Sequence, residues 1–169
     1  MPDMPVPIKN PCPSLLLEQA LVSRFRECHL TFALAESCTG GMIAERITSI
    51  PGASDLFKGG VVAYSNEVKH TLLGVSQAIL ETEGAVSEPC ATAMADGARK
   101  AFQADIAVSV TGIAGPGGGT STKPVGLVFI GIATKGAVTA ERHLFTGDRA
   151  QIRQQASELA LTAALRAAR

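Results

Sequence analysis

The stretch TFALAESCTGGMIAERITSI, residues 31–50, sets the fold class of the chain. It opens with a short, mostly apolar run, Thr31–Ala35, which is typical of a buried strand. ESCTGG, residues 36–41, forms a glycine-containing turn and leads into Met42–Ile50, whose isoleucines recur at helical spacing until Pro51. The pattern predicts a strand, a glycine turn and a helix, which is the repeating unit of α/β proteins.

The residues on either side of this unit predict more helices and strands. Helices are expected where apolar side chains recur every three or four residues behind a capping residue, and strands where short apolar runs are bounded by turn signals. The expected helices are residues 14–28, 66–73, a short one after Ser76, 87–102, and one from about Asp148. The expected strands are residues 60–65, 106–110, 127–134 and 138–145, the last two joined by a hairpin turn at Lys135-Gly136. The order of these elements predicts a three-layer α/β/α single domain with a mixed, partly parallel sheet.

Composition and charge narrow the classes of function. The chain has 169 residues, of which 46% are hydrophobic and 18% charged, with 15 basic and 15 acidic side chains. This supplies a core for one domain, and the absence of a basic surplus argues against electrostatic binding of nucleic acid or of a membrane surface. We therefore expect no nucleic-acid partner and no membrane partner.

The N-terminal segment and the cysteines indicate the compartment. Five of the nine prolines lie in residues 1–13, which predicts a flexible tail before a domain at 14–169. The segment lacks the pattern of a secretory signal, so a cytoplasmic location is expected. The cysteines form no C-x-x-C pair and no histidine lies at ligand spacing from them, which favours free thiols over disulfides or zinc. These cysteines are Cys12, Cys28, Cys38 and Cys90.

The glycine turn ESCTGG carries the first candidate chemistry. A nucleophile such as Ser37 at a helix N-terminus gains from the partial positive charge there, and the N–H groups of Cys38 to Gly41 are candidates to bind an oxyanion or a phosphate. An ordinary capped turn is the alternative interpretation of this hexapeptide. Cys38 is a rival nucleophile, although a cysteine without a nearby histidine is more often a buried apolar side chain.

A lysine in the segment YSNEVK, residues 64–69, is the candidate base. If Asn66 caps the helix that follows, Lys69 lies about one turn inside it, and its amine could reach back toward the strand ends. Burial favours the neutral amine, which could activate a serine, whereas a solvated helix lysine is the alternative. No G-x-S-x-G elbow is present and no histidine lies beside a glycine turn, so a serine with a lysine is the remaining covalent option.

Two further segments could bind an anion. TGIAGPGGG, residues 111–119, has five glycines whose N–H groups could approach a nucleotide or phosphate, but it matches neither a Walker loop nor a dinucleotide fingerprint. The alternative is a flexible surface loop. In TGDR, residues 146–149, Arg149 could bind a phosphate or carboxylate, or form only a surface pair with Asp148.

Several blocks taken together resemble the CinA C-terminal family, nicotinamide-mononucleotide deamidase. The blocks are ALAESCTGG, YSNEVK, GAVSEP, TGIAGPGGGTSTKPVG and TGDR, and the resemblance covers residues 14–169 in order. It implies hydrolysis of the carboxamide of nicotinamide mononucleotide to nicotinic acid mononucleotide and ammonia, a salvage step in pyridine-nucleotide metabolism. It further implies no metal and no cofactor, a homo-oligomer, and a stand-alone form without the larger N-terminal domain that many members carry.

The resemblance also implies roles for single residues. Ser37 would be the nucleophile, Lys69 its proton acceptor and Arg149 a further functional cation, with Arg153 as an alternate for that cation. A non-catalytic nucleotide-binding or regulatory module, or an amidase for another small carboxamide, remains open. The residues implied for the oxyanion or the substrate are Cys38, Thr39, Gly40, Gly41, Tyr64, Asn66, Thr111, Gly112, Gly115 and Gly117.

Overall fold

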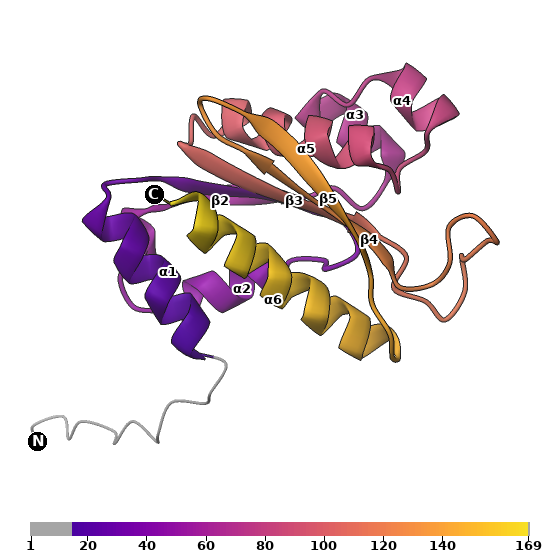
Figure 1. Ribbon diagram of the computed structural model, residues 1–169. Coiled ribbons are helices and arrows are strands. Elements are labelled where there is room, and N and C mark those ends of the chain that lie inside the picture. The colour runs from indigo at the N-terminus through magenta and orange to yellow at the C-terminus, as the bar shows by residue number, and fades with distance from the viewer. Residues whose placement is uncertain (1–14, 169) are drawn as a thin grey trace, which may run out of the picture.

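A single mixed β-sheet forms the middle of the molecule (Figure 1). The computed structural model describes residues 15–168, so the expected tail at 1–13 and the first residue of the helix expected at 14–28 lie outside the described residues. The sheet has five strands in the order β2-β1-β3-β4-β5. They are β1 Phe32–Glu36, β2 Phe57–Val62, β3 Ile106–Gly112, β4 Leu127–Ala133 and β5 Val138–Leu144. β1 runs parallel to β2 and β3, whereas β4 is antiparallel to β3 and β5, which confirms the mixed, partly parallel sheet.

Helices cover both faces of this sheet and complete three layers (Figure 1). Buried side chains of α1, α2 and α6 share one core with Leu34, Val108 and Ile130 of the sheet. Those of α3, α4 and α5 share the other core with Ala33 and Ala107. The helices are α1 Leu15–Glu27, α2 Met42–Thr48, α3 Asn66–Leu73, α4 Gln77–Thr82, α5 Glu88–Ala101 and α6 Arg149–Ala167, with a short 3-10 helix, η1, at Ala53–Asp55.

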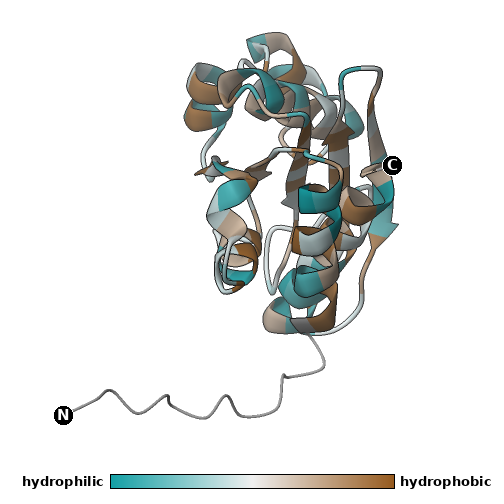
Figure 2. Cartoon of the chain, turned by 90° about the vertical axis from the view of Figure 1, so that its left-hand side faces the viewer, coloured by the Kyte–Doolittle hydropathy of each residue, from teal (hydrophilic) through white to brown (hydrophobic). Residues whose placement is uncertain are grey.

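The central strands are apolar because they are covered on both sides. All five residues of β1 are buried, and the first six of β3 are buried as well, whereas the edge strands β2 and β5 alternate between less and more exposed positions. The strands in the middle of the sheet are correspondingly brown in Figure 2. Phe32 of β1 packs edge-on against Phe25 of α1 with ring centroids 5.4 Å apart, and so joins the outer helix to the sheet.

The structure corrects two expected boundaries near the candidate lysine. The strand expected at residues 60–65 lies three residues earlier, at Phe57–Val62, because β2 pairs with β1 from Phe57 onward. Ser65, not Asn66, is the N-cap of α3: its backbone is extended and its Oγ accepts a hydrogen bond from the Val68 N–H at 3.2 Å. Lys69 is therefore the fourth residue of the helix, one turn inside it as expected.

Candidate active site

Ser37 lies directly beyond the carboxyl end of the central parallel strand β1. Its N–H donates to the Val110 carbonyl of β3 at 2.9 Å, so the strand pairing continues into the first residue of the turn. The chain then turns sharply before α2 begins at Met42. The Ser37 side chain is only 9% exposed. The backbone thus fixes this serine at the carboxyl ends of the parallel strands, which is where ligands bind in open α/β folds.

Lys69 contacts the Ser37 hydroxyl directly. Its Nζ donates to Ser37 Oγ at 3.1 Å and to the Ala63 carbonyl at 2.7 Å. The lysine side chain is 2% exposed, and within residues 15–168 it forms no ion pair with a carboxylate. Burial therefore lowers the pKa of Lys69 below its usual value of 10.5. A buried amine with a lowered pKa on a serine hydroxyl is the arrangement of a nucleophile and its base.

The neighbouring thiol of Cys38 is a poor rival for the serine. Its side chain is buried, and burial raises its pKa to about 11 against the attraction of the Arg153 and Lys69 charges. The thiolate is the reactive form of a cysteine, so a thiol with this pKa stays protonated near neutral pH. The burial and the raised pKa of the Cys38 thiol therefore favour Ser37 as the candidate nucleophile.

The carboxylate of Glu36 occupies the N-terminus of α2. This side chain is 1% exposed, and its two oxygens accept from the N–H groups of Gly41 at 3.0 Å, Ile43 at 3.1 Å and Ala44 at 2.9 Å. The Gly40 N–H donates to the Ser37 carbonyl at 3.1 Å. The expectation that Gly40 and Gly41 bind an oxyanion is therefore wrong for these N–H groups, since the protein itself uses both. Sequence reasoning assigned no role to Glu36, although its position as the first residue of a glycine turn that leads into a helix was a usable signal.

Two N–H groups of the turn remain available. Within the described chain, the N–H groups of Cys38 and Thr39 donate to no backbone carbonyl. The buried Oγ1 of Thr39 also lacks a partner among the described residues. The carbonyls of Cys38 and Thr39 are both held by Arg153, whose Nε donates to the first at 3.0 Å and whose Nη2 donates to the second at 2.7 Å. Free donors directly after a nucleophile have the arrangement of an oxyanion hole.

Arg149 brings three of the sequence segments together. Its Nη1 donates to the Gly115 carbonyl at 2.8 Å, and its Nη2 donates to the Tyr64 hydroxyl at 3.2 Å. Asp148 does not pair with it; that carboxylate caps α6 by accepting from the Gln151 N–H at 2.9 Å. Arg149 is exposed, and so is the Tyr64 side chain at 63%. An exposed cation beside an exposed aromatic ring is suited to binding a small anion that carries a ring.

The comparisons with known proteins show the family of the chain and agree with its fold. The family model of the CinA C-terminal domain matches residues 15–168. The chain belongs to the CinA family. A putative competence-damage inducible protein of Moorella thermoacetica is 55% identical over 133 residues, which are 79% of this chain and 32% of that protein. A CinA-like protein of Thermotoga neapolitana is 50% identical over 145 residues, 86% of this chain and 35% of that protein.

Solved CinA-family structures have the same fold. The competence/damage inducible protein CihA of Agrobacterium tumefaciens superimposes with a TM-score of 0.88 at 39% identity and covers 94% of this chain and 99% of its own. A CinA superfamily protein of Escherichia coli gives a TM-score of 0.86 at 32% identity and covers 93% and 91%. The chain spans about a third of the length of the curated relatives it matches.

Four sequence-predicted residues of this CinA domain lie apart from the hydrogen bonds around Ser37 and Arg149. Thr111 is buried and its hydroxyl donates to the Ala85 carbonyl at 2.7 Å, so its side chain serves the fold. A Cβ at Gly112 would meet Val128 of β4 at 2.6 Å, so this glycine allows the strands to approach. Asn66 is exposed and does not cap α3, and Gly117 lies in open space on the loop.

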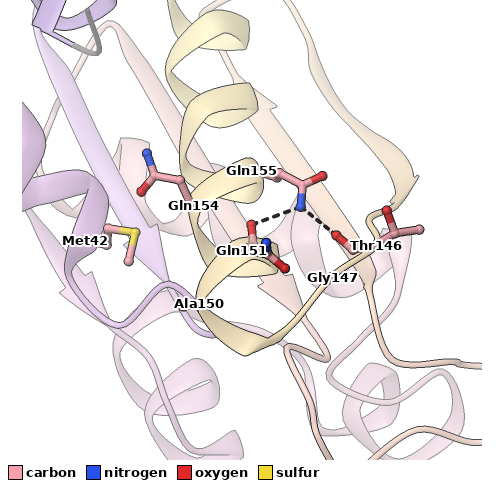
Figure 3. A pocket seen from close by; sticks show the side chains of 7 residues that line it. All are labelled: Met42, Thr146, Gly147, Ala150, Gln151, Gln154 and Gln155. Carbon is pink, nitrogen blue, oxygen red and sulfur yellow. Dashed lines mark hydrogen bonds between the residues drawn. The ribbon is translucent and has the colours of Figure 1, made fainter. Parts of the chain in front are cut away.

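A pocket of about 750 Å³ adjoins the turn of the CinA domain between α2 and α6 (Figure 3). Within it, Gln155 Nε2 donates to the carbonyls of Thr146 at 2.8 Å and Gln151 at 3.0 Å. It carries no charged side chain and does not include Ser37, so it offers a surface beside the reactive groups, not a reactive centre. Its lining residues are Met42, Thr146, Gly147, Ala150, Gln151, Gln154 and Gln155.

The described residues contain neither a cluster of metal ligands nor a helix that could span a membrane. Across residues 15–168, no three His, Cys, Asp or Glu side chains gather in a way that could hold a metal ion. In this part of the chain, every helix is too short or too polar to cross a bilayer. Cys28, Cys38 and Cys90 are free thiols, and Cys12 lies outside the described residues.

Proposed function

We propose that this CinA domain is an amidohydrolase that converts nicotinamide mononucleotide to nicotinic acid mononucleotide and ammonia. The observation that carries the proposal is the 3.1 Å hydrogen bond between Lys69 Nζ and Ser37 Oγ at the carboxyl end of β1, with both side chains buried. Ordinary lysines are solvated, so a buried lysine that has no carboxylate partner among residues 15–168 points to a chemical role. The resemblance to the deamidase family supplies the substrate.

In the proposed reaction, these groups act in the following order. Ser37 Oγ attacks the carboxamide carbon while the neutral Lys69 amine accepts the hydroxyl proton. The oxygen of the tetrahedral intermediate takes the negative charge and is bound by the N–H groups of Cys38 and Thr39. Lys69 then donates its proton to the departing nitrogen, which leaves as ammonia. Water next attacks the resulting ester, gives its proton to Lys69, and Ser37 regains a proton as the acid is released.

The substrate would be held by few charged groups. Arg149 would bind the phosphate, and the exposed ring of Tyr64, which accepts a hydrogen bond from Arg149 through its hydroxyl, would contact the nucleotide. A chain with 15 basic and 15 acidic residues has no general attraction for anions, so recognition of a single phosphate would rest on placed groups and backbone donors. We also propose that the domain works as a homo-oligomer, as the resemblance implies, and that it works in the cytoplasm.

Replacement of the serine tests this function. Ser37→Ala should keep the melting temperature of the wild type and lower ammonia release from nicotinamide mononucleotide at least about 1,000-fold, as expected when a nucleophile is removed. Ser49→Ala is the matched control, because the Ser49 hydroxyl only donates to the Glu45 carbonyl at the end of α2. This control should keep full activity.

The same assay separates the alternatives. Full activity in Ser37→Ala would contradict the serine mechanism. Binding of nicotinamide mononucleotide by the wild type without ammonia over hours would favour a non-catalytic nucleotide-binding module. A panel of nicotinamide, its riboside and its mononucleotide decides the substrate, and the proposal requires the mononucleotide to have the highest kcat/KM.

A further inference from the structure

Two charged side chains, the buried Glu36 and the half-buried Arg153, hold the backbone of the serine turn. Glu36 accepts from the Gly41 N–H at the end of the turn. Arg153 of α6 donates to the consecutive carbonyls of Cys38 at 3.0 Å and Thr39 at 2.7 Å. Arg153 is half-buried, and a Cβ at Gly40 would lie 3.7 Å from its Nη2. The guanidinium thus lies against the backbone of the turn.

The peptide groups in this turn connect Arg153 to the oxyanion donors. A trans peptide directs its C=O and its N–H to opposite sides. The Cys38 carbonyl belongs to the same peptide group as the Thr39 N–H, which is free among the described residues. A positive charge on the carbonyl end polarises the group and strengthens the N–H as a donor.

The second contact of Arg153 fixes the shape of the turn. The Thr39 carbonyl shares its peptide group with the Gly40 N–H, and that N–H donates back to the Ser37 carbonyl at 3.1 Å. Arg153 therefore holds two successive peptide groups, one that closes the turn and one that presents a free donor.

We propose that Arg153 is a positioning residue. It orients and polarises the Thr39 N–H, which binds the oxyanion formed when Ser37 Oγ attacks the substrate. The inference rests on the proposed function only in taking Ser37 as the nucleophile. The two arginines of α6 then have different roles. Arg153 holds the turn, so its loss should lower kcat, whereas Arg149 is exposed and contributes to substrate binding, so its loss should raise KM.

The test uses the full chain and a reagent that does not depend on the natural substrate. A fluorophosphonate forms a bond from its phosphorus to Ser37 Oγ, loses fluoride and leaves the serine proton with Lys69, and intact-protein mass spectrometry follows the adduct. Arg153→Met should slow this labelling about 10- to 100-fold, somewhat less than the full loss of an oxyanion donor. Added methylguanidine should restore part of the labelling rate of Arg153→Met. The labelling rate of Arg153→Lys should lie between those of Arg153→Met and the wild type. In the deamidase assay, kcat should fall by a similar factor with KM within about twofold.

Arg24→Met is the matched control. Arg24 Nε also donates to a backbone carbonyl, that of Ala168, at 2.8 Å, but far from the turn. Its labelling rate should equal that of the wild type. Wild-type labelling in Arg153→Met, or equal slowing in Arg24→Met and Arg153→Met, would overturn the proposal.

Failure of the proposed function gives a different pattern. A wild type that labels at Ser37 but releases no ammonia from nicotinamide mononucleotide would remove the deamidase function, and the labelling rates of the variants would still decide the role of Arg153. Labelling at a residue other than Ser37 would overturn both. If Arg153→Met does not fold, Arg153→Lys and a folded Arg153→Ala are used in its place. The inference would be contradicted if Arg153→Lys kept the wild-type labelling rate and kcat and if added methylguanidine had no effect on Arg153→Ala.

Discussion

The two glycine-rich segments of the CinA domain have opposite designs. In the turn at residues 36–41, the buried Glu36 carboxylate accepts hydrogen bonds from backbone N–H groups, and Arg153 donates hydrogen bonds to backbone carbonyls. Charged side chains thus hold much of the backbone here. In the loop at residues 111–119, residues 116–119 are exposed, and a Cβ at Gly117 would meet nothing within 4 Å. The contact of this loop with the site is the Gly115 carbonyl, which accepts from Arg149.

This difference shows that glycine content alone does not define an anion site. In the turn, the glycine N–H groups already donate to the protein itself, whereas those of Cys38 and Thr39 donate to no backbone carbonyl of residues 15–168. In the loop, the glycines allow close packing at its base and leave its tip open. The turn is thus suited to chemistry, which requires fixed donors, and the loop to contact with a ligand.

The largest effect is expected at the carboxylate of the turn. Glu36→Gln replaces an oxygen that accepts hydrogen bonds by an amide that donates them, next to N–H groups that also donate. Because hydrogen bonds to charged groups contribute about 1.5–3 kcal/mol each, the free energy of unfolding should fall by at least about 3 kcal/mol. Urea denaturation measures this loss, and ammonia release should fall with it because the turn loses its fixed shape.

The same substitution at an exposed helix start is the control. Asp148 caps α6 with a carboxylate that accepts from the Gln151 N–H, and both residues are exposed. Since Asn and Asp are similar as N-caps, Asp148→Asn should cost less than about 1 kcal/mol. Equal losses in the two variants would show that the buried turn has no special dependence on its charge.

Intermediate and small effects are expected inside the glycine loop. Gly115 has φ of 80°, and a Cβ there would lie 2.7 Å from Val125 Cγ1. Gly115→Ala should therefore lower the free energy of unfolding by about 1–3 kcal/mol, because a left-handed backbone costs a residue with a Cβ about 1–2 kcal/mol before any clash. It should also raise KM, because the Gly115 carbonyl holds Arg149.

Gly117→Ala is the matched change at the open tip of the loop. With open space around the new methyl group, its stability should stay within about 0.5 kcal/mol of the wild type. Thermal unfolding of both variants checks the pair. A loss at Gly117 as large as that at Gly115 would mean that the tip is as constrained as the base.

Much of the fold was predictable from the sequence because local patterns and tertiary packing agree there. The apolar run at Thr31–Ala35 became the central strand β1, and Ser76 and Ser87 cap α4 and α5 as their positions predicted. The boundary of β2 was missed because the strand begins at Phe57-Lys58-Gly59, where pairing with β1 and not an apolar pattern defines it. Asn66 was preferred over Ser65 as a cap because both are good capping residues and only the backbone angle decides between them.

The candidate site was predictable as a set of residues but not as a set of contacts. Ser37 and Lys69 are 32 positions apart, and only the register of β1 with β2 and β3 brings their side chains together. The roles of Glu36 and Arg153 depend on which backbone groups face them, and sequence patterns do not contain that information. The sequence alone could not decide whether Arg149 or Arg153 is the functional cation, because the two lie one helical turn apart on α6.

The pH dependence of kcat/KM tests most directly whether buried Lys69 is the base for Ser37. Burial lowers the pKa of Lys69 below 10.5, so the neutral amine forms at lower pH than in water, and the rate should rise through that lowered pKa to a plateau. Lys69→Ala should lose the plateau, with a large fall in kcat that hydroxide partly restores as the pH increases. An unchanged kcat and the same profile in Lys69→Ala as in the wild type would contradict the serine–lysine mechanism.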